Sequence, residues 1–308
     1  MPKTHVSKSI FIAAEPNKVY TLINDFSHWT AWSPWAILET EAKVSVASDG
    51  KYFEWEGNRI GSGNMKITKE KGPHKIWADL TFLKPFKSKA KIEYTLTESE
   101  GGTQVTWEMY SSLPFFMFFM KDMMQKMIGM DFDRGLKMLK DLVENGKVNC
   151  KLTQENNQLF ETVHYVGIKG TTPMTEMGLD MSKKIPQLKD YIKANNLESN
   201  GEIISIYHKW DMKNQTATYT LAAVVKTLPQ NTIGHIISGT IPTTKVNKVI
   251  HTGDYDHLGN AWTMQMMMQR NKEFKQNKKM DPFEVYKNSP FHTPSEELIT
   301  EVMFPTLD

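Results

Sequence analysis

The stretch that decides the fold lies near the end of the chain, at residues 251–270 (HTGDYDHLGNAWTMQMMMQR) and 282–286 (PFEVY). We expect a strand over residues 244–252, then a glycine-containing turn and a helix over residues 258–276. A short strand follows in the second motif, and a last strand covers residues 298–304. The order strand, helix, strand, strand predicts an α+β unit.

The same order of elements occurs once before along the chain. A strand over residues 159–169 precedes a helix over 175–195, and strands at 202–209 and 216–225 follow. Pro186 falls inside this helix, and we expect it to kink or restart the helix because proline lacks a backbone N–H. The two blocks predict an internal repeat of architecture, although their sequences do not repeat.

Residues 160–307 resemble the GyrI-like family, the effector-binding domain of AraC- and MerR-type regulators. The resemblance rests on the motifs 251–255 (HTGDY), 258–262 (LGNAW) and 282–286 (PFEVY), together with the strand at 219–224 (YTLAAV). It implies a small-molecule-binding domain whose ligand-contacting acidic residue is Glu284. Such regulators usually carry a helix-turn-helix domain before this module, and other sequence occupies that place here. Direct nucleic-acid binding is therefore not expected.

Glu284 is the main candidate binding residue. Alternation along a strand puts it on the same face as Tyr286. A carboxylate among aromatic rings suits a cationic or hydrogen-bond-donating lipophile, since charge and ring faces both attract such a group. Composition alone favours a solvent-facing glutamate over a ligand-contacting one. The family resemblance favours the ligand-contacting glutamate instead. The other predicted walls of the site, each of which could instead be core, are Tyr207, Tyr219, Tyr255 and Trp262.

An enzyme is the alternative for this half. Some GyrI-like proteins resemble hydrolases that open strained, electrophilic rings with a glutamate and a tyrosine that position water. Glu284 would then be the general base or acid, with Tyr255 or Tyr207 as hydrogen-bond donor. A catalytic carboxylate and a binding carboxylate both need desolvation and a shifted pKa. The spacing therefore leaves both open, and we favour binding.

The first half of the chain predicts an antiparallel meander closed by a helix. Pro16 suits the first turn of an early helix, and glycine-containing turns separate the strand candidates that follow. A long helix over residues 117–145 ends at Gly146, a C-cap candidate. The expected strands cover residues 6–13, 42–48, 51–56, 61–69, 75–82, 90–98 and 103–111.

Residues 3–147 resemble the START-like polyketide cyclase/dehydrase superfamily (SRPBCC). The resemblance rests on the opening strand and on the segments 14–20 (AEPNKVY) and 25–35 (DFSHWTAWSPW). It implies a helix-grip fold, in which a curved antiparallel sheet wraps the last helix around a cavity. Members bind lipids, hormones or polyketides, and a minority are enzymes.

The helix-grip cavity would be lined by tryptophans and by a methionine-rich helix. Methionine is flexible and repacks around different ligands, although it also simply fills irregular cores. The apolar segment 115–120 is expected to be a gate of the cavity or a contact surface for another protein. The predicted ligand-binding residues of this half are Trp32, Trp55, Trp107, Met120 and Met124.

Composition excludes several classes of function. The 37 basic and 35 acidic residues leave a net charge of +2, which provides no field for nucleic acid or anionic membranes. The single cysteine, Cys150, permits no internal disulfide, and no signal-peptide segment is visible. The nine histidines lack metal-ligand spacing, and no nucleotide-binding loop occurs. We therefore expect a cytoplasmic protein without metal or cofactor.

The sequence thus predicts two ligand-binding domains in tandem, at residues 1–147 and 159–308, joined by a polar linker at 148–158. The favoured function is binding of small hydrophobic molecules in a sensor, sequestration or resistance role. The ligand of the second half is expected to carry a positive or hydrogen-bond-donating group that faces Glu284. One alternative is hydrolysis of reactive lipophilic compounds by Glu284 with a tyrosine. The other is a ligand-responsive adaptor or a partner of a transcription regulator. A protein partner or a homodimer is compatible with the sequence.

Overall fold

The computed structural model describes residues 3–112 and 119–307. The chain divides into two compact units, Met1–Asn149 and Cys150–Asp308. Both units combine an antiparallel sheet with helices, so the predicted α+β class is confirmed. Within the described ranges, no helix is long and apolar enough to cross a bilayer. Of the predicted gate at residues 115–120, residues 115–118 lie outside the described residues.

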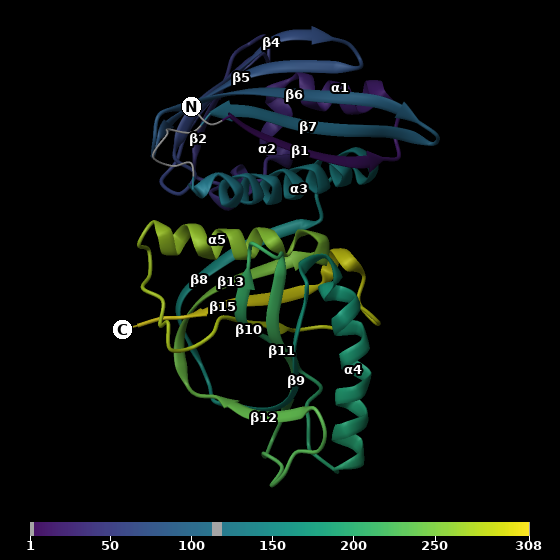
Figure 1. Ribbon diagram of the computed structural model, residues 1–308, viewed down its shortest axis with the longest axis vertical. Helices are drawn as coiled ribbons and strands as arrows, with labels where there is room; N and C mark the ends of the chain where they lie inside the picture. Colours follow the sequence, from purple (N-terminus) through teal and green to yellow (C-terminus); the bar gives the residue numbers. More distant parts are fainter. Residues whose placement is uncertain (1–2, 113–118, 308) are drawn as a thin grey trace. The chain divides into compact units, whose positions relative to one another are not determined.

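The first unit is a seven-stranded antiparallel sheet followed by one long helix (Figure 1). The strand order β1-β7-β6-β5-β4-β3-β2 places successive hairpins side by side and pairs the first strand, β1, with the last, β7. The strands are β1 (Lys3–Ile12), β2 (Lys43–Val46), β3 (Tyr52–Glu56), β4 (Ser62–Lys71), β5 (Lys75–Lys84), β6 (Ser88–Ser99) and β7 (Gly102–Ser112).

Helix α3 (Lys121–Asn145) packs beside β1 and closes the core of the first unit. It ends where Gly146 adopts the left-handed conformation (φ 75°), as predicted for a C-cap. Pro16 is the first residue of α1 (Pro16–Asn24). A backbone N–H at this position has no acceptor within the helix, so proline, which lacks the N–H, breaks no hydrogen bond there. Helix α2 (Trp29–Trp32) follows after a short turn. This order of elements confirms the predicted helix-grip fold.

The second unit contains an eight-stranded antiparallel sheet in the order β12-β9-β11-β10-β14-β15-β13-β8. Its helices are α4 (Met177–Ala194) and α5 (Gly259–Arg270). The strands are β8 (Cys150–Phe160), β9 (Val163–Pro173), β10 (Ile203–Asp211), β11 (Thr216–Val225), β12 (Ile236–Ile241), β13 (Thr244–Gly253), β14 (Phe283–Tyr286) and β15 (Ile299–Pro305).

This sheet is built from the predicted repeat, β9-α4-β10-β11 and β13-α5-β14-β15. Each repeat contributes three adjacent strands in the order first, third, second, and the two halves meet where β10 pairs with β14. The outer strands are exchanged. The strand that precedes the first repeat, β8, pairs with β13 of the second, and β12 pairs with β9 of the first. Backbone pairing therefore ties each repeat to the other.

Residues 150–160 form β8, where the sequence suggested a linker up to residue 158. The Asn- and Gln-rich composition misleads because β8 is an edge strand, and backbone hydrogen bonds to β13 hold it. Lys248 of β13 adds ion pairs to Glu155 of β8, at 2.7 Å, and to Glu301 of β15, at 3.2 Å. Strand β12 was also not foreseen.

Helix α4 runs without a break through Pro186, so the predicted restart is wrong. Proline removes one hydrogen bond to the carbonyl four residues earlier, at Ser182. Both residues are exposed, so that carbonyl can bond to water. One turn of the helix is also supported by Gln187, whose side-chain amide donates to the carbonyl of Lys183 at 2.9 Å.

We predict opposite effects for two glycine substitutions in α3. A Cβ at Gly135 would lie 2.9 Å from the Trp107 ring and 3.0 Å from Pro34, which are held by the core, so Gly135→Ala destabilises the first unit. A Cβ at Gly129 would meet the flexible end of Lys8 at 3.0 Å. Gly129→Ala should therefore stabilise by up to about 1 kcal/mol through helix propensity.

Urea unfolding of the two variants beside the wild type measures this difference. Equal effects of both substitutions would contradict the close approach of α3 to Trp107.

Candidate functional site

The candidate site lies where the two repeats of the second unit meet. In the pairing of β10 with β14, Ser205 lies opposite Glu284. Alternation then puts Tyr207, two residues further along β10, and Tyr286, at the end of β14, on the same face as Glu284. Helices α4 and α5 cover this face, since Leu188 and Trp262 join its apolar cluster. The Glu284 side chain is buried, with 1% of its surface exposed.

Three aromatic side chains donate hydrogen bonds to the Glu284 carboxylate. The Tyr207 hydroxyl lies 2.8 Å from Oε2, and the Tyr286 hydroxyl lies 2.5 Å from the same oxygen. The Trp262 indole N–H lies 2.5 Å from Oε1. The donors come from β10, β14 and α5, so both repeats contribute to the site.

The Glu284 carboxylate lacks a cationic partner within residues 3–112 and 119–307. Among the described residues, no lysine, arginine or histidine side chain bonds to it. Burial raises the pKa of Glu284 above its usual value, although the hydrogen bonds from Tyr286, Trp262 and Tyr207 act in the opposite direction. A buried carboxylate normally has an ion-pair partner, so this one is unusual.

Aromatic rings form the wall beside Glu284. The Tyr207 ring meets Trp262 edge to face at 4.8 Å and stacks on Trp210 at 5.0 Å. Trp210 also contacts Trp262 at 5.4 Å, and it is 37% exposed. The sequence did not single out Trp210, because strict alternation along the strand puts it on the other face of the sheet from Tyr207. A bulge between Tyr207 and Lys209 shifts the register and brings both rings to one side.

Tyr255 lies beside this site without bonding to Glu284. Its ring meets the Tyr286 ring edge to face at 5.9 Å. Burial and the negative charge of Glu284 raise the pKa of Tyr255 to about 12, while the nearby Thr300 opposes the shift. A direct role of the Tyr255 hydroxyl next to Glu284, as considered for an enzyme, is therefore less supported than one of Tyr207 or Tyr286.

Tyr219 is fully buried and contacts a second acidic residue. Its hydroxyl donates to Asp180 Oδ2 at 2.6 Å, and Lys184 donates to the same oxygen at 2.6 Å. The sequence singled out neither Asp180 nor Lys184. Their i, i+4 spacing on the predicted helix was the available signal, but nothing in that spacing identifies the strand against which the pair packs.

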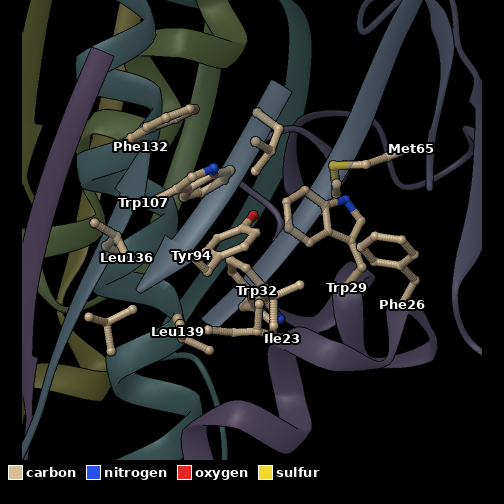
Figure 2. Close-up of a cluster of buried hydrophobic side chains, with 14 of the residues drawn as sticks. Ile23, Phe26, Trp29, Trp32, Met65, Tyr94, Trp107, Phe132, Leu136 and Leu139 are labelled. Atoms are coloured by element: carbon tan, nitrogen blue, oxygen red, sulfur yellow. The ribbon is translucent and has the colours of Figure 1, made fainter. Parts of the chain in front are cut away.

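In the first unit, the predicted ligand residues have different environments. Trp32 and Trp107 are buried in the core, where the Trp107 ring stacks on Phe132 of α3 at 4.0 Å (Figure 2). The indole N–H groups of these two tryptophans and the Tyr94 hydroxyl have no hydrogen-bond partner among the described residues. The remaining predicted residues, all partly buried, are Trp55, Met120 and Met124.

Two surface hollows occur in the first unit, with volumes of about 770 and 460 Å³. The larger lies between the segments 13–15 and 98–102, and the smaller lies beside α1 and the end of α3. Neither is lined by the predicted tryptophans or methionines. Those side chains remain predicted ligand contacts.

Buried histidines form a further polar group in the second unit. His251 is fully buried opposite Thr300 in the sheet, and neither ring nitrogen has a hydrogen-bond partner in the described part of the chain. Burial and the nearby His257 lower the pKa of His251 to about 4. No group of three His, Cys, Asp or Glu side chains within residues 3–112 and 119–307 has the arrangement of a metal site.

Family models match both units. Residues 159–307 match the GyrI-like small molecule binding domain. Residues 3–144 match the family described as polyketide cyclase / dehydrase and lipid transport. Both predicted resemblances are confirmed, and the chain consists of two small-molecule-binding domain types in tandem. No curated protein matches the chain.

Solved structures show distant similarity. One is the EcmrR–DNA complex (20% identity, 61% of this chain and 68% of that one, TM-score 0.44). Another is the EcmrR C-terminal domain (22% identity, 52% and 98%, TM-score 0.44). A third is the Aha1 dimer from Colwellia psychrerythraea (20% identity, 47% and 98%, TM-score 0.35). At these TM-scores the similarities contribute nothing to a functional assignment.

We predict that acid destabilises the GyrI-like unit through His251. The folded-state pKa of about 4 lies below the ordinary value of 6.5, so the unfolded chain binds a proton that the folded chain does not. The free energy of unfolding therefore falls as the pH drops below about 6.5, and the loss is complete below about 4. For this group, the loss from pH 7 to pH 5 is about 2 kcal/mol.

Urea unfolding at both pH values measures this loss, and His251→Leu is the matched variant. The variant should lose about 2 kcal/mol less than the wild type over the same interval. Identical pH profiles would show that His251 does not titrate abnormally.

Proposed function

We propose that the second unit binds a lipophilic cation, with Glu284 as its counter-ion. The observation that carries this proposal is a carboxylate, 1% exposed, which accepts hydrogen bonds from three aromatic donors and from no cation among the described residues. The match to a small-molecule-binding family supports it. Ligand binding would supply the charge that the site lacks.

The chemistry of the site favours a cation over a neutral ligand. Burying an ionised carboxylate costs several kcal/mol, and neutral hydrogen bonds offset only part of that cost. A cation offsets more of it through direct attraction in a region of low dielectric. The faces of Tyr207, Trp210 and Trp262 add cation–π attraction and apolar contact. An ammonium or similar ion with apolar substituents satisfies both requirements.

Access to Glu284 lies on the side of the partly exposed rings. Trp262, Trp210 and Tyr286 retain some solvent contact, whereas Tyr207 is buried. Trp262 is held on α5 and bonds only Oε1, so its displacement exposes one oxygen while both tyrosines keep the other. A ligand that replaces the indole N–H would then reach the carboxylate with little change in the strands.

For the first unit, we propose binding of an apolar molecule that carries a hydrogen-bond acceptor. The indole N–H groups of Trp32 and Trp107 are donors without a partner in the described chain, and the Tyr94 hydroxyl is also unbonded. Buried donors of this kind are usually satisfied, so an acceptor on a ligand fits them. Two ligand-binding units in one chain suit a sensor, sequestration or resistance role.

Hydrolysis is the second candidate function for the GyrI-like unit. The observation in its favour is that two tyrosine hydroxyls meet one oxygen of a carboxylate whose pKa is raised by burial. Such a group can act as a general acid or base for water near a reactive ligand.

Replacement of Glu284 by Gln tests the binding proposal. We expect Glu284→Gln to weaken binding of decyltrimethylammonium by roughly 30-fold or more, because a desolvated ion pair is lost. Binding of decanol, which has the same chain and no charge, should change little. Isothermal titration calorimetry measures both affinities.

The matched control is Glu202→Gln, which removes a carboxylate paired with Lys287 at 2.9 Å outside the site. It should bind both probes like the wild type. Equal loss for both probes, or unchanged affinity of Glu284→Gln for the cation, would refute the counter-ion role. Turnover of a strained-ring substrate that disappears in Glu284→Gln while its affinity persists would favour hydrolysis instead.

A further inference from the structure

A lysine is built into the aromatic wall next to the proposed binding site. Lys184 of α4 is buried, with 8% of its surface exposed, and its Nζ lies 2.6 Å from Asp180 Oδ2. The same Nζ lies 4.3 Å from the centre of the Tyr219 ring. The ammonium group therefore has both a carboxylate and an aromatic face, the two partners expected of a cation-binding site.

The backbone leaves space for this ammonium group. Gly170 of β9 lies opposite Tyr219 of β11 in the sheet. A Cβ at Gly170 would lie 3.0 Å from Lys184 Nζ, so a larger residue would press on the ammonium group. The bare backbone of Gly170, a carboxylate on α4 and a tyrosine on β11 are thus arranged around one positive charge.

This group repeats the arrangement at Glu284. Tyr207 and Tyr219 are directly opposite each other on β10 and β11, and their rings stack at 6.0 Å. Each tyrosine donates its hydroxyl to a carboxylate, Tyr207 to Glu284 and Tyr219 to Asp180. The two positions differ in their cation, because Asp180 has a cationic partner and Glu284 has none among the described residues. They also differ in burial, since the Asp180 side chain is 28% exposed and Glu284 is 1% exposed.

We propose that Asp180 and Tyr219 form a second cation site, which Lys184 occupies, and that this lysine restricts the ligand of the second unit to a single positive charge. The inference rests on the proposed function of Glu284. Lys184 is anchored four residues from Asp180 on the same helix, so its local concentration exceeds that of any free ligand. A second positive charge on a ligand would also be repelled by the ammonium group.

Substitution of Lys184 tests this specificity. We expect the wild type to bind decyltrimethylammonium and to gain nothing from a second charge in a series of bis(trimethylammonium) alkanes with three to ten methylenes. In Lys184→Met, at least one spacer length should bind about tenfold more tightly or better than in the wild type. Binding of the monocation should change by less than about threefold.

Matched variants separate specificity from stability. Lys184→Arg keeps the charge and should keep the wild-type preference, and Lys183→Met removes a neighbouring exposed lysine and should also keep it. Adding Asp180→Asn to Lys184→Met should abolish the gain for dications. Lys184→Gln is the second variant if Lys184→Met does not fold, and it should show the same gain.

The outcomes distinguish this inference from the proposed function. If no dication gains affinity in Lys184→Met or Lys184→Gln, while the monocation still binds in a Glu284-dependent way, Lys184 is only a structural ion pair. If the monocation does not bind to the wild type, the counter-ion role of Glu284 fails and the inference fails with it.

Discussion

A carboxyl group buried without a positive partner in the described part of the chain is the constraint on which the second unit depends. Burial of the Glu284 carboxylate is tolerated because three aromatic donors from different elements form hydrogen bonds with it. Those donors are polar enough to solvate the carboxylate in part and apolar enough to exclude water. The same combination of rings and charge supports the proposal that a lipophilic cation binds at this position. Burial of the group and its suitability for binding therefore have a common physical origin.

The symmetry of the sheet explains why the donors converge. Two similar repeats meet at β10 and β14, and each brings a helix over the same face. Trp262 from the second helix and Tyr207 from the first repeat thus approach one carboxylate at the junction. The exchanged edge strands β8 and β12 tie the repeats together. The candidate site therefore needs both repeats in place.

Much of this architecture could be predicted from local sequence patterns. Glycine turns and alternation predicted the meander of the first unit, and alternation placed Tyr286 on the same face as Glu284. The choice of Glu284 as a site residue came from the resemblance to the GyrI-like family, because composition alone favoured a solvent-facing glutamate. The features that the sequence did not predict depend on contacts between segments that are distant in the chain. The polar strand β8 is held by backbone pairing that its side chains do not reveal, and Trp210 reaches the site through a bulge. Asp180 and Lys184 matter because of the strand opposite them, which the helix sequence alone does not identify.

The most direct test of the central claim is the pKa of Glu284 itself, measured by carboxyl-carbon NMR with Glu284→Gln as the assignment control. In the ligand-free protein we expect a pKa clearly above the ordinary value of 4.5, because burial disfavours the charge. Saturating decyltrimethylammonium should lower that pKa, because the cation stabilises the ionised form. A pKa at or below 4.5 in the free protein, or one that the cation leaves unchanged, would contradict the account.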